Sequence, residues 1–418
     1  AHINVLSKNR GTPNLALRDA RTDERLQNLF NTLVRFEVGA ASFTVEPADP
    51  AEAEAFWQSR VDGPPLVAAL DTTARGVQLL LDNGLADLPL SQRLECLAGY
   101  LRAPGPRAGE FAHLREWIER GLGSGIARHF MLPYNEKIWD CPLERVSMGL
   151  VKNKIDPEPW WKVVRNAFVP GTVGRAYQAR FLYPRAGAGA LVEALAARVA
   201  PVLRLGWEVA SAAHDSNGWT VRSASGAAVA ARMVVSTVPI PRLLDALGGP
   251  ERAEFSGRFR HNDTYIVAVG LKEGVRPPRF GDCHWVFFAG PELFYRVTVM
   301  SALRPQAPTT LVAEVTRKGE AAGLSPEALV SRVLAGLRAS GLVPDEGSVA
   351  LAECRLERFT YPIPTVGLEE DRRRLEESLA RRSLHLLGRS GRWDYVNTDG
   401  IFAAVDAFMQ RHDAGLRG

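Results

Sequence analysis

The chain has 418 residues, of which 46% are hydrophobic and 23% are charged, and its formal net charge is +4. This length allows two or three domains, and the composition is that of an ordinary globular protein. The small net charge argues against nucleic acid as the main partner. No run of 18 apolar residues occurs, so we expect no membrane span. The four cysteines and eight histidines are scattered without metal-ligand spacing, which predicts a reduced, cytoplasmic protein with no metal site.

The first 170 residues are predicted to contain one strand followed by a mainly helical region. Residues 2–8, HINVLSK, alternate apolar and polar side chains, which is typical of a strand. From about residue 24 to 170 the apolar side chains recur mostly at helical spacing, as in the amphipathic residues 90–101, LSQRLECLAGYL. We therefore expect a helical insertion after the first strand.

Residues 181–247 are expected to mix helices and strands. A glycine loop leads into a helix at about 190–199, and residues 205–214 and 218–225 look like paired strands joined by a turn. Residues 231–247, ARMVVSTVPIPRLLDAL, then read as a buried strand, a proline break and a helix.

From about residue 262 the pattern predicts a β-rich unit. A helix interrupts it at residues 325–340, where Ser325 and Glu327 make a plausible helix start. The predicted strands are TYIVAVGL, CHWVFFAG, LFYRVTVMS, TTLVAEVT and ALAECRLERFTY.

The C-terminal segment reads as strand, glycine loop and helix, with residues 388–400, GRSGRWDYVNTDG, as the loop. Such a loop presents backbone N–H groups and the positive helix end to an anion, usually a phosphate. Gly388 permits a close approach, and Arg389 can clamp a phosphate with two hydrogen bonds. The alternative is an ordinary loop with solvated arginines, in which Asp399 only caps the helix.

Two further segments could line a ligand site. In residues 295–297, YRV, an arginine lies among apolar strand residues; from this fragment alone an edge-strand arginine is the better interpretation. Residues 131–142, MLPYNEKIWDCP, mix aromatic and polar groups after a helix, as loops that border ligands do, and a turn packed on the core fits equally well. The sequence has no G-x-G-x-x-G, P-loop, H-E-x-x-H or G-x-S-x-G motif, so neither a zinc site nor a histidine-centred nucleophile is supported.

In their order along the chain, six segments resemble UDP-galactopyranose mutase and its relatives among the amine-oxidase-like and protoporphyrinogen-oxidase-like flavoproteins. They are GIARHFMLPYNEKIWDCPLERV, YPRAGAGALVEAL, GWEV, FYRVTV, TYPIPTVGLEEDRRRLEE and LLGRSGRWDYVNTDGIFAAVDAF. The resemblance runs from about residue 110 to the C-terminus. Each motif alone is weak, whereas six in the right order are fairly specific for the superfamily, though not for one reaction.

The resemblance implies an FAD-dependent oxidoreductase or mutase that acts on a small molecule such as a nucleotide sugar. It assigns substrate binding to Tyr134, Trp139, Arg296, Tyr361, Arg389 and Tyr395. It assigns cofactor binding to Val209, Gly388, Arg389, Trp393 and Asp399. It assigns no catalytic residue. A buried pair of arginines would be costly unless an anion joined it, and a substrate diphosphate is a natural third member.

The N-terminal part departs from the family pattern. Residues 3–21 look like the family's second strand, so the first strand and the G-x-G-x-x-G loop are expected to be missing, and Ser7 stands where an acidic residue should bind ribose. One alternative is an incomplete or diverged flavoenzyme that still needs FAD. The other is a flavin-free member that binds a nucleotide sugar or a partner protein without redox chemistry. A homodimer, or a partner chain that supplies the glycine loop, would fit a split enzyme.

The predicted fold class is α/β, or α+β overall. It comprises a Rossmann-like FAD-binding domain that is incomplete at its N-terminus, a helical insertion and a β-rich substrate domain. The FAD-binding domain is expected to combine residues 1–23, 184–250 and 381–418, the insertion to span 24–183, and the substrate domain to span 251–380.

Overall fold

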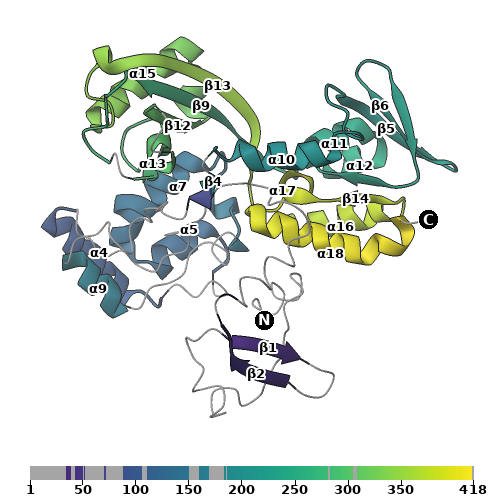
Figure 1. The fold of residues 1–418 in the computed structure, drawn as a ribbon. Helices are drawn as coiled ribbons and strands as arrows, with labels where there is room; N and C mark the ends of the chain where they lie inside the picture. The colour runs from purple at the N-terminus through teal and green to yellow at the C-terminus, as the bar shows by residue number, and fades with distance from the viewer. Residues whose placement is uncertain are drawn as a thin grey trace. The chain divides into compact units, whose positions relative to one another are not determined.

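The computed structural model divides the chain into two compact units, one of 1–68 with 396–418 and one of 69–395. The residues that the structure describes are 34–38, 43–49, 51, 70–71, 88–105, 111–149, 160–168, 183–184, 186–280, 283–304 and 308–416. The strand predicted at residues 2–8, with Ser7, lies outside them. Helices and strands are mixed throughout, which confirms the α/β class, whereas the domain boundaries given above stay a prediction (Figure 1).

The first unit contains a hairpin and the C-terminal helix. Strands β1 (Val34–Val38) and β2 (Phe43–Pro47) pair antiparallel within the stretch that was expected to be mainly helical. Their alternating side chains, V-R-F-E-V and F-T-V-E-P, have the period of a strand. Helix α18 (Thr398–Leu416) begins with a bond from the Ile401 N–H to the Asn397 carbonyl, so Asp399 lies in the first turn rather than at the cap.

The second unit contains a five-stranded antiparallel sheet with the order β10-β11-β12-β9-β13. Its strands are β9 (His261–Leu271), β10 (Trp285–Phe287), β11 (Arg296–Val299), β12 (Thr310–Thr316) and β13 (Val349–Pro362). All five predicted strands are therefore confirmed. Helix α15 (Pro326–Ala339) lies against the sheet (Figure 1), and Ser325 caps it by accepting a hydrogen bond from the Ala328 N–H at 3.2 Å.

Successive side chains along these strands point to opposite faces of the sheet, and one of the two faces packs on a hydrophobic core. Val267, Val269 and Leu271 of β9 are at most 3% exposed. They pack in one cluster with Leu329 and Val333 of α15. On β11 and β12, Arg296 and Glu314 alternate with the buried Val297 and Ala313 and therefore lie on the other face, where the candidate site lies.

The helical part of this unit packs around a second core. It contains α4 (Leu90–Arg102), α5 (Leu114–Glu116), α6 (Ser124–Ile126), α7 (Leu132–Ile138) and α9 (Trp160–Phe168). Trp117 and Ile118 are fully buried in it. Helices α4 and α6 cross closely at Gly125, where an added Cβ would meet the Cys96 backbone nitrogen at 2.5 Å. Only glycine permits this approach.

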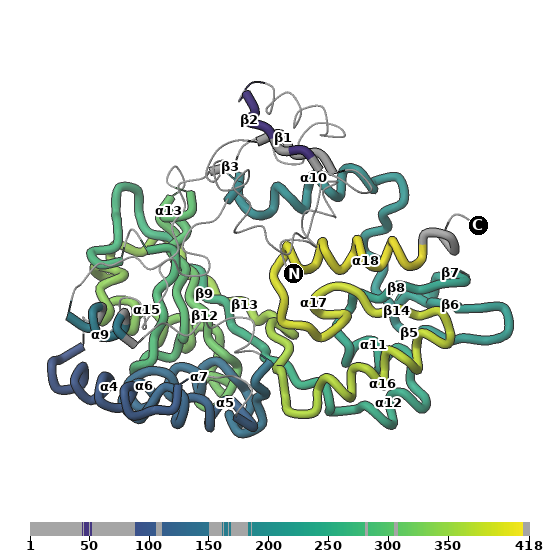
Figure 2. The backbone as a smooth tube through the Cα atoms, turned by 90° about the horizontal axis from the view of Figure 1, so that it is seen from below, coloured from purple at the N-terminus to yellow at the C-terminus, as the bar shows by residue number. Residues whose placement is uncertain are grey.

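A third core joins short strands and helices. The antiparallel strands are β5 (Val209–Asp215), β6 (Gly218–Ser223) and β7 (Ala228–Ala231), and the parallel pair is β8 (Val234–Ser236) with β14 (Leu384–Leu386). The helices are α11 (Ile240–Leu247), α12 (Gly249–Phe255), α16 (Leu368–Ala380) and α17 (Gly388–Gly391), whereas α10 (Gly189–Val199) has no buried residue and adds nothing to this core. Figure 2 shows α11, α12 and α16 beside these strands. No helix among the described residues is long and apolar enough to cross a membrane.

Candidate functional site

Five segments of the second unit bring an arginine and aromatic cluster together. The cluster comprises Trp139 after α7, Tyr295 and Arg296 at β11, Glu314 on β12, Tyr361 on β13, and Arg389 and Tyr395 at and after α17. Five of the six residues that the resemblance assigned to substrate binding therefore lie in one cluster. Glu314 was not predicted.

Arg296 is held by a half-buried ion pair. It donates from Nε and Nη2 to Glu314 Oε1 at 2.8 and 2.6 Å, and from Nη2 to the Tyr361 hydroxyl at 3.0 Å. The Tyr295 hydroxyl donates to the second Glu314 oxygen at 2.7 Å. Burial acts against the charge, but Tyr361, Glu314 and Tyr295 together raise the pKa of Arg296 above its ordinary value. Arg296 therefore stays cationic, and Glu314 supplies the anion that we had expected from a substrate.

The aromatic part of the cluster stacks around Tyr361 and Tyr395. Their ring centroids are 5.8 Å apart with an interplanar angle of 29°, and Trp139 meets both rings edge-on at 6.4 and 6.2 Å. The guanidinium carbon of Arg389 lies 5.3 Å from the Tyr361 centroid and 4.7 Å from that of Tyr395, within cation–π range. The cluster thus presents a cation on aromatic faces.

Burial keeps the hydroxyl groups of Tyr395 and Tyr134 neutral. Burial raises the pKa of Tyr395 to about 12 and Tyr361 adds to the rise, while Arg389 and Arg296 act in the opposite direction. Burial also raises the pKa of Tyr134 well above its ordinary value. These two phenols therefore act as hydrogen-bonding groups rather than as phenolates at neutral pH.

Tyr134 lies near the cluster but makes its ring contacts elsewhere. Its ring stacks on Phe130 at 4.9 Å and meets Phe287 edge-on at 5.7 Å. Arg296 acts on its pKa, so the two groups interact electrostatically. Tyr134 therefore borders the cluster on the side of α7.

The residues expected to bind the cofactor come from several parts of the fold. Val209 begins β5 and is 40% exposed. Trp393 is 2% exposed and donates from Nε1 to the Arg260 carbonyl at 3.0 Å, so its ring belongs to the third core. Gly388 begins α17 with φ at 76°, which favours glycine. Asp399 belongs to the other unit.

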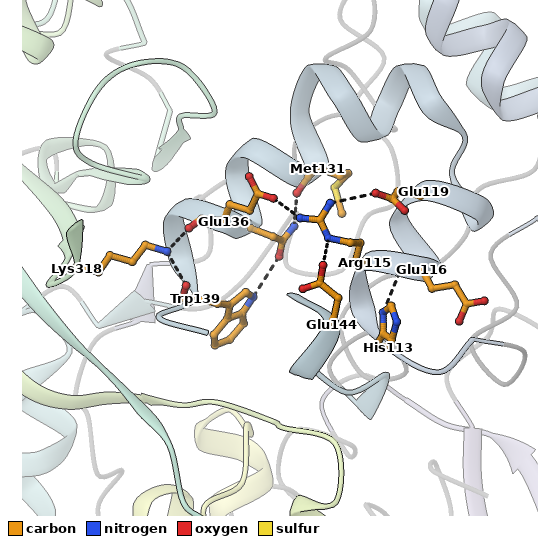
Figure 3. A network of polar contacts seen from close by, with 10 residues as sticks. His113, Arg115, Glu116, Glu119, Met131, Glu136, Trp139, Glu144 and Lys318 are labelled. Atoms are coloured by element: carbon orange, nitrogen blue, oxygen red, sulfur yellow. Dashed lines mark hydrogen bonds and ion pairs between the residues drawn. The ribbon is translucent and has the colours of Figure 1, made fainter. Parts of the chain in front are cut away.

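A polar network lies next to Trp139 (Figure 3). Arg115 pairs with Glu136 and Glu144 at 2.6 Å each and with Glu119 at 3.1 Å. Lys318 donates from Nζ to the Trp139 carbonyl at 2.6 Å and to the Glu136 carbonyl. Arg115, Glu136, Glu144 and Lys318 of this network line an open cavity of about 380 Å³ together with Trp139. Its charges are largely taken up by pairs within the protein, so the network serves to hold the chain.

The side chains of the cluster can bind an anion beside a planar ring. Cation, phenol hydroxyl groups and aromatic faces together suit a phosphate ester that carries a ring. In the described part of the chain, no group of three or more His, Cys, Asp and Glu side chains could hold a metal ion.

Comparison with known protein families identifies the class of this chain. The chain belongs to the family of flavin containing amine oxidoreductases, because the family's model matches residues 162–400, more than half of the chain. The expected superfamily is thereby confirmed, and membership implies a flavin cofactor.

Solved structures of several enzymes share the fold. Reduced UDP-galactopyranose mutase is 24% identical with a TM-score of 0.74, over 84% of this chain and 79% of that chain. A protein from Exiguobacterium sp. 255-15 that is assigned as a protoporphyrinogen oxidase is 15% identical with a TM-score of 0.60, over 92% and 90%. Putrescine oxidase is 14% identical with a TM-score of 0.51, over 92% and 90%. At such identities the likeness shows the fold alone.

The residues present fit one side of a dinucleotide cofactor. In open α/β domains, ligands bind at the carboxyl ends of parallel strands. At that end of β8, the Ser236 hydroxyl is buried without a hydrogen-bond partner among the described residues. The neighbouring strand β14 leads into Gly388 and Arg389. Ser236 and the α17 backbone would hold the polar rim of a flavin nucleotide there.

Proposed function

We propose that this chain is a flavin-dependent oxidoreductase or mutase that binds a nucleotide sugar, or a similar phosphorylated small molecule, at the arginine and aromatic cluster. The observation that carries the proposal is Arg389, whose guanidinium lies over the faces of Tyr361 and Tyr395. A cation fixed on two aromatic faces can bind a diphosphate while the adjacent rings pack against the sugar or base. The absence of a disulfide among the four cysteines is compatible with the cytoplasmic location expected above.

Each residue of the cluster has a definite task in this proposal. Arg389 binds the diphosphate with the planar edge of its guanidinium. Tyr361 accepts a hydrogen bond from Arg296, which leaves its phenolic proton to be donated to a ligand oxygen. Trp139 and Tyr395 exclude water and orient the ring. A bound flavin would supply one of two kinds of chemistry. It could accept a hydride during the oxidation of a C–N or C–C bond, or it could form a bond with the anomeric carbon of a sugar.

Two measurements on the purified chain test the proposal. A visible spectrum after incubation with FAD and desalting should retain flavin bands. In isothermal titration with UDP, Arg389→Ala should weaken binding by ten-fold or more, roughly 1.4 kcal/mol. Arg389→Lys keeps the charge but not the planar guanidinium, so it should restore only part of the affinity. Arg381→Ala, which removes an exposed arginine at the end of α16, is the matched control and should change nothing. Equal UDP affinity in wild type and Arg389→Ala would contradict the proposal.

A flavin-free binding protein is the second candidate. The observation that favours it is Arg389 over the faces of Tyr361 and Tyr395, because this arrangement could bind a nucleotide sugar without a flavin. A protein that binds UDP through Arg389 but takes up no FAD would support it. FAD uptake only after a peptide or second chain with a G-x-G-x-x-G loop is added would instead support a split enzyme.

A further inference from the structure

Asn262 connects two residues of the aromatic cluster, Trp139 and Tyr361. Its side chain is fully buried at the start of β9. It donates from Nδ2 to the Ile138 carbonyl at 2.7 Å and accepts at Oδ1 from the Asp140 N–H at 3.0 Å. These two backbone groups flank Trp139. A neutral side chain with a donor and an acceptor side by side is required for this bridge, and among residues of this size only asparagine has both.

The backbone of Asn262 positions the other aromatic residue of the pair. In the ladder between β9 and β13, Asn262 is the partner of Tyr361. The register is interrupted between Glu357 and Tyr361, where Phe359 has φ at 58°. Such irregularities redirect side chains next to functional sites. The Thr360 hydroxyl donates to the Asn262 carbonyl at 3.0 Å and fixes the strand again just before Tyr361.

Other side chains support the same segment. Thr316 donates from Oγ1 to the Ile138 carbonyl at 2.8 Å. Lys318 donates to the Trp139 carbonyl, and Arg260 donates from Nη2 to the Asp140 carbonyl at 3.0 Å. Carbonyls at the end of a helix have no partner within the helix, and here the sheet supplies their donors. The end of α7 is thus held to β9 and to residues at the end of β12.

We propose that Asn262 is a positioning residue that fixes Trp139 against Tyr361 and thereby sets the ligand-binding face of the cluster. Its amide determines where the chain on either side of Trp139 lies, and its backbone determines where Tyr361 enters the site. The consequence for ligand binding rests on the function proposed above. The placement of Trp139 does not, and it can be measured without any ligand.

The test uses fluorine NMR of the full chain labelled with fluorotryptophan, in which Trp139→Phe identifies one resonance among the nine tryptophans. Asn262→Ala removes both hydrogen bonds and should shift and broaden the Trp139 resonance. It should also weaken UDP binding by roughly three- to thirty-fold. Val267→Ala opens a void in the core on the same strand, away from Trp139, and is the matched control. It should leave both readouts unchanged.

A milder variant covers the case in which Asn262→Ala does not fold. Thr316→Val keeps the shape and removes one donor to the Ile138 carbonyl, so it should move the Trp139 resonance in the same direction by less. An unchanged resonance in the folded variant overturns the proposal, and so does a shifted resonance with unchanged UDP affinity. If the wild type itself binds no UDP, the proposed function fails, and the resonance alone then decides whether Asn262 places Trp139.

Discussion

Replacing Glu314 by glutamine would remove the charge that neutralises Arg296 while keeping the shape of the side chain. The Glu314 side chain is 10% exposed and that of Arg296 is 28% exposed. Removing one partner of a buried ion pair typically costs about 3–5 kcal/mol, because the other charge is left uncompensated. Glutamine still offers an oxygen to Arg296 and Tyr295, and Arg296 reaches some solvent. We therefore expect Glu314→Gln to lower the free energy of unfolding by about 2–3 kcal/mol.

Urea unfolding followed by circular dichroism measures this loss, and a double-mutant cycle assigns it to the pair. Arg296→Met removes the cation, and combined with Glu314→Gln it should cost less than the sum of the two single changes. The reason is that the double variant leaves no charge buried alone. A loss below about 0.5 kcal/mol for Glu314→Gln, or strict additivity in the cycle, would refute the view that this pair is a coupled, half-buried unit.

Two further predictions concern stability. Burial lowers the pKa of Lys137 to about 8 from an ordinary 10.5, although Glu292 acts in the opposite direction. Between these two pH values the unfolded chain therefore binds more protons than the folded chain, so the free energy of unfolding rises with pH. In urea unfolding between pH 8 and 10.5, the free energy of unfolding of the wild type should rise by up to about 3 kcal/mol relative to that of Lys137→Met. A difference between the two proteins that does not change with pH would contradict the lowered pKa of Lys137. Gly391→Ala places a Cβ 2.5 Å from the Ser236 carbonyl oxygen and should lower the free energy of unfolding by about 1–3 kcal/mol. Gly189→Ala, whose Cβ would meet nothing closer than 3.8 Å, is its control, and equal losses for both would show that the contact is relaxed at no cost.

Periodicity predicted the strands of the large sheet and the capped helix α15 because each is a long, regular pattern with a clear face. It did not predict the hairpin of β1 and β2. The two five-residue strands lie in a long stretch whose apolar spacing is otherwise helical, and short runs of this kind suit either structure.

The candidate site was only partly predictable from the sequence. The order of the motifs indicated Arg296, Tyr361, Arg389 and Tyr395, and the fold brings them together. Glu314 was missed, although an acidic residue inside the apolar run TTLVAEVT is a signal. Its meaning depends on register, because Glu314 lies directly opposite Arg296 on the neighbouring strand, and a sequence does not state which strands pair.

Trp393 and Tyr395 show a second limit of sequence patterns. Both are aromatic residues of the same loop, and the resemblance assigned Trp393 to cofactor binding and Tyr395 to substrate binding. Trp393 has φ at 54°, and its ring is buried against Phe259 and His261, whereas Tyr395 joins the cluster. The direction of each ring follows from a backbone conformation that residue type alone does not reveal.

The parallel pair of β8 and β14 has a consequence for the order of folding. Residues 237–383, which include the whole five-stranded sheet, lie between these two short strands. Closing so long a loop costs conformational entropy before the hydrogen bonds between β8 and β14 can stabilise the pair. The antiparallel strands β5, β6 and β7, by contrast, are connected by short local turns. We expect the sheet to fold first and to act as a preformed bridge that carries β14 back to β8. The loop with Arg389 would then be among the last parts of the site to become ordered.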